Sequence, residues 1–317
     1  MNLLSSNVFD PDKDIPDLSG KVFIVTGGSA GIGFGICAHL LQHNPEKIYL
    51  LSNKEDHADE SIQKLGEWGD ASKVEWKKCN LEDLEQTKEI AEELKQLPKI
   101  DALICNAGLG VGVYNESRDG IDTHMQVNVF AQNLLLMILL PVLLKTPDSR
   151  IVLQSSENHR VVSSETYYKD MEEINKDIGP TFLYNRTKLA QILFARRLVK
   201  HLKAQGKGES VWINSTHPGG VSTDQPHQAE EAYGLLGKVG VAVVRPFLAD
   251  PVKQGCKSAL YAATSPEIIE KKIQGSYIIP DKKVTEPSSN ALNDELAENL
   301  WKLNEDVLRK KFGKLPY

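Results

Sequence analysis

The stretch Lys21-Val22-Phe23-Ile24-Val25-Thr26-Gly27-Gly28-Ser29-Ala30-Gly31-Ile32-Gly33 decides the fold of this chain. Its first half is an apolar run rich in β-branched residues, which predicts a strand, and a helical pattern follows to about His43. A glycine-rich turn between strand and helix aims backbone N–H groups and the helix N-terminus at a pyrophosphate. The alternative is a tight turn that needs glycine for positive φ. The GxxxGxG spacing at this junction favours the phosphate-binding interpretation.

Strand and helix patterns alternate along the rest of the chain, with short connections between most of them. Such alternation predicts a mostly parallel sheet covered by helices on both faces. We therefore predict the α/β class and one doubly wound (Rossmann) domain with seven strands. The predicted strands are 21–26, 48–52, 74–79, 102–105, 151–154, 211–214 and 275–279.

The predicted domain spans residues 20–317, behind a polar N-terminal arm, 1–19, that we expect to lie over its surface. Long insertions after sheet strands are where α/β proteins place substrate loops, and we assign this role to 157–181 and 222–250. The second segment also fits two ordinary amphipathic helices, while its glycines suit a mobile lid. A helical extension, 288–317, is predicted to close the chain.

Composition excludes several classes of protein. The chain has 317 residues and a net charge of −6, with a pI near 5.8, so a basic nucleic-acid-binding face is not expected. The longest apolar run, 134–144, is shorter than the ~18 residues of a membrane span, and the N-terminus lacks a signal-peptide pattern. Four scattered cysteines without a CxxC pair indicate reduced thiols in the cytoplasm. We expect no membrane anchor.

A candidate proton-transfer pair opens the helical pattern 184–198. Tyr184 and Lys188 are four residues apart and therefore share one helix face. A phenol in water titrates near ~10, and a nearby ammonium favours the phenolate and lowers this pKa. The pair would then exchange a proton with a substrate oxygen at neutral pH. Taken alone, the spacing also fits an amphipathic face with a snorkelling lysine. The surrounding motifs decide between the two interpretations.

These motifs together resemble the short-chain dehydrogenase/reductase superfamily over nearly the whole chain. Within it the chain is similar to the retinol-dehydrogenase-like group and its fungal relatives. Six motifs in the family order carry the resemblance: Thr26-Gly27-x-x-x-Gly31-Ile32-Gly33, Asn106-Ala107-Gly108, Asn128, Ser156, Tyr184-x-x-x-Lys188 and Pro218-Gly219.

The resemblance implies a catalytic role for four residues. Ser156 would hold the substrate carbonyl oxygen by a hydrogen bond that strengthens as charge develops there. Tyr184 would be the general acid in reduction and the base in oxidation. Lys188 would lower the Tyr184 pKa and hold the nicotinamide ribose, and Asn128 would position a water that links Lys188 to solvent. Strand alternation sends the neighbouring Ser155 side chain the other way.

The choice of cofactor depends on the residues that follow the second strand. An acid there would bind the ribose 2′-hydroxyl of NAD and repel the 2′-phosphate of NADP. Ser52, Asn53 and Lys54 supply no acid and one cation, which favours NADP, with NAD as the alternative. Asn80 stands where the family often has an adenine-binding Asp. The implied cofactor contacts are Gly27, Ser29, Gly31, Ile32, Gly33, Ser52, Asn53, Lys54, Asn80, Leu81, Asn106, Ala107, Gly108, Tyr184, Lys188, Pro218, Gly219, Val221 and Thr223.

The sequence thus predicts an NADP-dependent oxidoreductase that moves hydride between the nicotinamide and a carbonyl or secondary alcohol of a fairly apolar small molecule. We expect a monomer or homodimer. We expect no metal site, since His39 and His43 lack a third ligand. A redox sensor that binds the dinucleotide without turnover is the alternative, and it would not need the tyrosine–lysine pair. A sugar-nucleotide epimerase would more often carry GxxGxxG.

Overall fold

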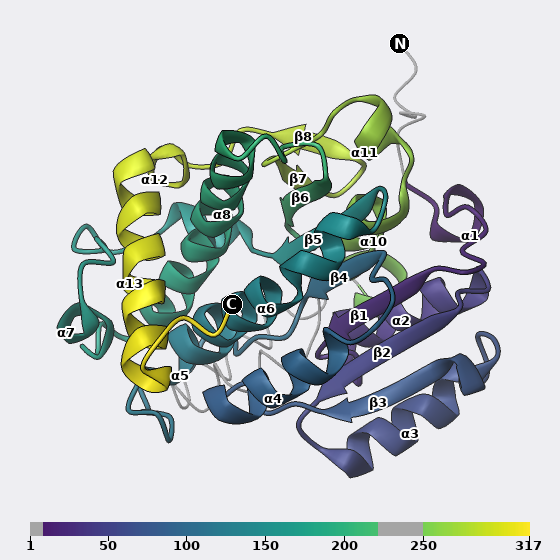
Figure 1. Ribbon diagram of the computed structural model, residues 1–317, viewed down its shortest axis with the longest axis horizontal. Coiled ribbons are helices and arrows are strands. Elements are labelled where there is room, and N and C mark those ends of the chain that lie inside the picture. Colours follow the sequence, from purple (N-terminus) through teal and green to yellow (C-terminus); the bar gives the residue numbers. More distant parts are fainter. Residues whose placement is uncertain (1–8, 221–249) are drawn as a thin grey trace.

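The sheet has the predicted doubly wound order. The computed structural model describes residues 9–220 and 250–317 (Figure 1). This part of the chain forms one eight-stranded sheet in the order β3-β2-β1-β4-β5-β6-β7-β8. The chain leaves β1 toward β2 and β3, then crosses to β4 on the other side, so the β1–β4 edge is the switch point where α/β proteins bind ligands. The strands are β1 (Val22–Thr26), β2 (Lys47–Ser52), β3 (Val74–Lys78), β4 (Ala102–Cys105), β5 (Ser149–Gln154), β6 (Val211–Thr216), β7 (Tyr277–Ile279) and β8 (Lys283–Thr285).

The predicted seven strands are all present, and the structure adds an eighth. Strands β1 to β7 pair in parallel, whereas β8 pairs antiparallel with β7. The β8 segment is three residues long and mostly exposed, so it has no apolar periodicity to reveal it in the sequence.

Helices cover both faces of the sheet, as expected (Figure 1). One face is covered by the helices that share a core cluster with the inner side chains of β4 and β5. These are α4 (Leu84–Leu94), α5 (Thr123–Met125), α6 (Ala131–Lys145), α8 (Pro180–Ala204) and α13 (Asp294–Phe312). The opposite face is covered by α2 (Gly31–Gln42), α3 (Glu55–Leu65) and α10 (Lys257–Thr264). Short helices complete the described chain: α1 (Pro11–Asp14), η1 (Ala71–Lys73), η3 (Glu157–Arg160), α7 (Met171–Ile174), η5 (Pro251–Gly255), α11 (Glu267–Glu270) and α12 (Ser289–Leu292).

The long helical pattern before β5 contains a π-helical turn. Helix α5 runs into η2, a π-helical segment over Gln126–Phe130, before α6 begins. Such turns leave backbone groups free of their usual helical partners and are frequent at functional sites. The combined segment Thr123–Lys145 is long and apolar enough to cross a membrane, but 89% of its most apolar window is buried inside this fold. It is the core helix between the sheet and α4.

The described part of the N-terminal arm is packed more deeply than expected. Phe9, Ile15 and Leu18 are buried against the α2–α10 face, and the Phe9 ring meets Tyr261 edge-on with centroids 5.7 Å apart. Apolar residues spaced through a polar segment gave no helical or strand period, so the sequence indicated only a surface arm.

All four cysteines are free and buried. They are Cys37 on α2, Cys79 after β3, Cys105 on β4 and Cys256 before α10. Burial raises the pKa of each thiol to about 12. The native protein therefore holds them as unreactive thiols at neutral pH.

Candidate active site

The glycine turn after β1 is closely packed. Gly27 has φ +65°, and a Cβ at Gly33 would lie 2.0 Å from the Gly27 carbonyl oxygen. Only glycine fits at position 33, and its absence of a side chain brings the start of α2 against the turn. Thr26 fixes the neighbouring strand end, because its hydroxyl accepts the backbone N–H groups of Asn106 and Ala107, each at 3.0 Å.

A cavity of about 430 Å³ opens at this switch point between β1 and β4. Nine residues predicted to bind the cofactor line it: Gly27, Ser29, Ser52, Asn53, Lys54, Asn80, Leu81, Ala107 and Gly108. The lining of this cavity suits a dinucleotide. A Cβ at Gly27 would lie 3.0 Å from Ala107, so the glycine keeps the cavity open at this point.

The remaining predicted cofactor contacts lie elsewhere. Gly31, Ile32 and Gly33 form the first turn of α2, and Asn106 faces inward, where its Nδ2 donates to the Thr26 carbonyl at 3.1 Å. Pro218 and Gly219 follow β6 and do not line this cavity. Val221, Thr223 and nearly all of the predicted lid, 222–250, lie outside the described residues.

The cavity also contains residues that the sequence analysis did not select: Thr26, Ala30, Leu51, His57, Cys79, Glu82, Leu109 and Val127. His57 is three residues after Lys54 in the first turn of α3, so helical spacing would have placed both on one side. Ser52 is 9% exposed, and its hydroxyl accepts a hydrogen bond from Trp76 Nε1 at 3.0 Å. Asn53 and Lys54 are exposed.

The predicted catalytic hydroxyls meet at the carboxyl end of β5. Ser156 is the N-cap of η3, and its Oγ accepts a hydrogen bond from the Asn158 N–H at 3.3 Å. Tyr184, near the start of α8, is 7% exposed. Burial raises the pKa of Tyr184 to about 12, and the nearby Ser156 hydroxyl opposes this shift. The preceding Ser155 points away, as alternation predicted, and its Oγ donates to the Lys188 carbonyl at 2.7 Å.

Lys188 does not lower the Tyr184 pKa in this arrangement. Its Nζ lies 5.4 Å from the centre of the Tyr184 ring and donates to the Gln154 carbonyl at 2.9 Å and to Gln191 Oε1 at 3.3 Å. Burial lowers the pKa of Lys188 to about 7, because the charged ammonium is removed from water. The amine is adjacent to the nucleotide cavity, because a Cβ at Gly108 would lie 3.6 Å from it.

Asn128 lies in η2 and joins the loop after β4 to helix α8. Its Nδ2 donates to the Leu109 carbonyl at 3.0 Å and to Thr187 Oγ1 at 2.9 Å, while its Oδ1 accepts from the Leu109 N–H at 2.7 Å. Its own backbone carbonyl accepts from Gln191 Nε2 at 3.0 Å. Ser156, Tyr184, Lys188 and Asn128 therefore form one connected group beside the cavity.

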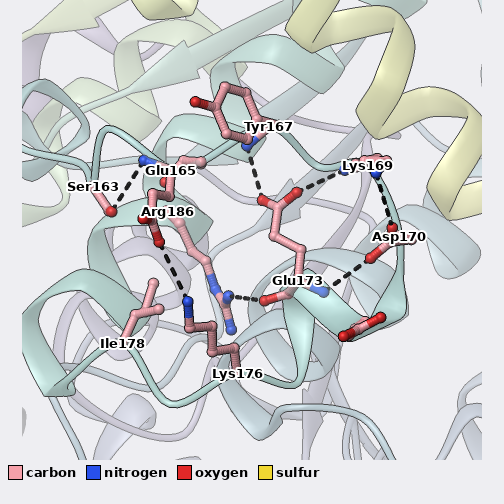
Figure 2. A pocket seen from close by; sticks show the side chains of 11 residues that line it. Ser163, Glu165, Tyr167, Lys169, Asp170, Glu173, Lys176, Ile178 and Arg186 are labelled. Atoms are coloured by element: carbon pink, nitrogen blue, oxygen red, sulfur yellow. Dashed lines mark hydrogen bonds and ion pairs between the residues drawn. The ribbon is translucent and has the colours of Figure 1, made fainter.

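Residues of the predicted substrate loop 157–181, together with Arg186 of α8, line a second cavity of about 510 Å³ (Figure 2). Arg186 lies in its wall and donates to the carbonyls of Glu173 and Ile174, at 3.3 Å and 2.6 Å. It also pairs with Asp122 at 3.2 Å. Although larger, this cavity is not the candidate cofactor site, because none of the predicted cofactor-binding residues lines it, whereas nine line the cavity at the switch point.

Comparisons with known proteins agree with this geometry. The short chain dehydrogenase family model matches residues 21–168. The mitochondrial protein bli-4 of Neurospora crassa, which carries an oxidoreductase name, is 37% identical over 310 residues, covering 94% of this chain and 74% of the relative. A short-chain dehydrogenase/reductase of Armillaria gallica is 31% identical over 320 residues, covering 96% and 98%. The solved Pseudomonas aeruginosa RhlG/NADP complex is 21% identical with a TM-score of 0.62, covering 83% and 95%. This chain belongs to the short-chain dehydrogenase/reductase family.

Proposed function

We propose that the chain is an NADP-dependent oxidoreductase that interconverts a carbonyl and a secondary alcohol, with Tyr184 as the general acid and base. Family membership makes it an NAD(P)-dependent oxidoreductase acting on a small molecule. One observation carries the finer proposal. The Tyr184 phenol, whose pKa is influenced by the nearby Ser156 hydroxyl, lies beside the Lys188 amine, which itself adjoins the nucleotide cavity at Gly108.

The proposed chemistry divides among three side chains. When bound, the nicotinamide supplies or takes up the hydride. The Tyr184 phenol gives its proton to the substrate oxygen in reduction and takes it back in oxidation. The Ser156 hydroxyl donates a hydrogen bond to the same oxygen as charge develops on it. The Lys188 amine holds the nicotinamide ribose through the N–H that is directed toward the cavity, so that the hydride donor faces the substrate carbon.

We propose a fairly apolar substrate. Val161, after η3, is 60% exposed, and Phe182, two residues before Tyr184, is 38% exposed. Both segments adjoin the catalytic tyrosine, because the Asn185 side chain, next to Tyr184, donates to the Val161 carbonyl. Exposed apolar side chains at this position would contact the body of a substrate whose oxygen reaches Tyr184.

The decisive experiment assays a panel of aldehydes, ketones and secondary alcohols with NADPH and NADH. With the substrate and dinucleotide that give the highest turnover, Tyr184→Phe should lower turnover by at least ~10²-fold while the dinucleotide still binds. Tyr167→Phe is the matched control, because Tyr167 is 53% exposed on the substrate loop. Near-normal turnover of Tyr184→Phe would overturn the assignment. Binding of the dinucleotide with no turnover of any substrate would instead favour the redox-sensor alternative.

We propose NADP as the preferred dinucleotide because the end of β2 presents no acid and the cavity includes Lys54 and His57. RhlG, of the same fold, is a protein solved with NADP. Ser52→Asp should shift preference toward NAD, since a carboxylate at this point repels a 2′-phosphate. Trp76 Nε1, now bonded to Ser52, would remain a donor to the new side chain. A wild-type protein that uses NADH better than NADPH would contradict the proposal.

We also propose a cytoplasmic monomer or homodimer. The mitochondrial name of the Neurospora relative makes the compartment a direct question, to be answered by imaging the tagged full-length protein beside a mitochondrial marker. A mass measurement in solution would decide between one and two subunits.

A further inference from the structure

Gln191 connects two members of the candidate active site that the resemblance linked through a water. Its Oε1 accepts from Lys188 Nζ at 3.3 Å, and its Nε2 donates to the backbone carbonyl of Asn128 at 3.0 Å. Gln191 lies on α8, three residues after Lys188, and is 2% exposed. Because a carbonyl can only accept, the Asn128 bond fixes which end of the amide faces Lys188.

We propose that Gln191 is the positioning residue of Lys188: its side-chain amide occupies the place between Asn128 and the lysine amine that was expected to hold a water. The proposal rests on the proposed function of Lys188 and adds a residue to that site. The π-helical turn η2 contributes, since it carries the Asn128 carbonyl that Gln191 binds.

This arrangement determines which N–H of Lys188 is available. The Gln154 carbonyl and Gln191 Oε1 are both acceptors, so together they hold two N–H groups of the amine whether it is charged or neutral. Among residues 9–220 and 250–317, the third position has no hydrogen-bond partner, and the amine adjoins Gly108 of the nucleotide cavity. The proton that Lys188 gains or loses is therefore the one directed toward the cofactor site.

The surroundings of the amine isolate this effect. The Gln154 carbonyl of β5, Gln191 on α8 and the loop at Gly108 bring neutral groups to it, and the Tyr184 ring, on α8, lies 5.4 Å from it. Burial is the one cause that lowers the pKa of Lys188 toward 7, with no charged group in the described chain contributing. A change in the Gln191 bond should therefore appear directly in the titration of Lys188.

The test compares three variants by a measurement that needs no catalysis. The free energy of urea unfolding is measured against pH without cofactor for each protein and for Lys188→Met. Subtracting the Lys188→Met curve leaves the pH dependence that is due to Lys188, and its midpoint is the pH at which Lys188 titrates in the folded chain. Gln191→Met removes the acceptor but fills the space, so the midpoint should fall by about one pH unit. Gln191→Ala empties a polar space that a water can enter and bridge, so its midpoint should stay near that of the wild type.

Gln126→Met is the matched control. Gln126 is also a fully buried glutamine in this region, but its amide bonds Ser117 and Asp119. Loss of its bonds should destabilise the fold without moving the Lys188 midpoint. An unmoved midpoint in Gln191→Met, or a fall in Gln191→Ala as large as in Gln191→Met, would overturn the proposal.

A second measurement ties the inference to catalysis. In a plot of kcat/KM against pH, one limb should reflect the titration of Lys188. In Gln191→Met this limb should shift by the same amount and in the same direction as the midpoint from the unfolding data. If the unfolding data behave as expected but no substrate is turned over by the wild type, Gln191 retains its positioning role and the proposed reaction fails instead. The two failures are therefore distinguishable.

Discussion

Arg186 and Lys188 are two cations on the same helix, two residues apart, and both are almost completely buried, at 1% and 3% exposure. Their surroundings differ. The Arg186 guanidinium pairs with the Asp122 carboxylate and donates to two backbone carbonyls at the end of α7. Within residues 9–220 and 250–317, the Lys188 amine donates to the neutral acceptors Gln154 and Gln191 and has no carboxylate partner.

The difference separates a structural charge from the one that we propose acts at the active site. A buried cation that has a counter-ion can hold two segments together, and Arg186 holds the loop 157–181 against α8. A buried amine without a counter-ion is costly and loses its charge easily, which is an arrangement associated with active sites. The face of α8 on which a cation lies thus determines its role, although the sequence places both within three residues.

The largest effect is expected from breaking the buried ion pair between Arg186 and Asp122. Arg186→Met should lower the free energy of unfolding by about 3–5 kcal/mol, because Asp122 is left buried without its partner. Urea denaturation would measure this loss. The double variant Arg186→Met with Asp122→Asn should recover most of it, since the second change removes the unpaired charge. A double variant no more stable than Arg186→Met would show that Arg186 acts through packing alone.

Removing the uncompensated cation should have the opposite pattern. Lys188→Met should lower turnover by about 10²-fold, because the amine that we propose holds the cofactor beside Tyr184 is lost. Its unfolding free energy at pH 7 should equal or exceed that of the wild type, since no partner is left charged and alone. Steady-state kinetics and urea denaturation on the same preparation test both parts. A Lys188→Met protein that is inactive because it is unfolded would make the two cations alike.

The smallest effect concerns pH. The pKa of Lys188 in the folded chain, about 7, lies below its ordinary value of 10.5. Between these values the unfolded chain binds a proton that the folded chain does not, so unfolding free energy should rise with pH. The wild type should gain up to about 1.4 kcal/mol per pH unit relative to Lys188→Met above pH 7. Parallel curves for the two proteins would place the lysine titration outside this window.

The sequence predicted the fold class because its signals are local and repeated. The strand–glycine–helix junction at 21–33 and the alternation after it led to the doubly wound sheet that the structure has, and comparison confirms the family. The strand β8 escaped because three mostly exposed residues carry no period. The arm residue Phe9 escaped because its burial depends on Tyr261, far away in the chain.

The candidate site residues that the sequence suggests are mostly those in recognisable motifs. Gly27, Ala107 and Gly108 belong to such motifs and line the cavity. Gln191 belongs to no motif used in the sequence analysis, and its proposed role depends on the Asn128 carbonyl of a π-helical turn. The expected lowering of the Tyr184 pKa was wrong for this arrangement, because spacing on a helix says nothing of burial. Burial raises that pKa and lowers that of Lys188.

The four buried thiols can report local opening of the native structure. Each is inert while covered, so a thiol-labelling reagent would react only as fast as its segment opens, and the four rates would give four local opening free energies. Cys79 lines the nucleotide cavity, whereas Cys37 lies within α2. If a dinucleotide slows the labelling of Cys79 more than that of Cys37, the ligand stabilises the segment around the nucleotide cavity. This measurement needs no catalytic assay.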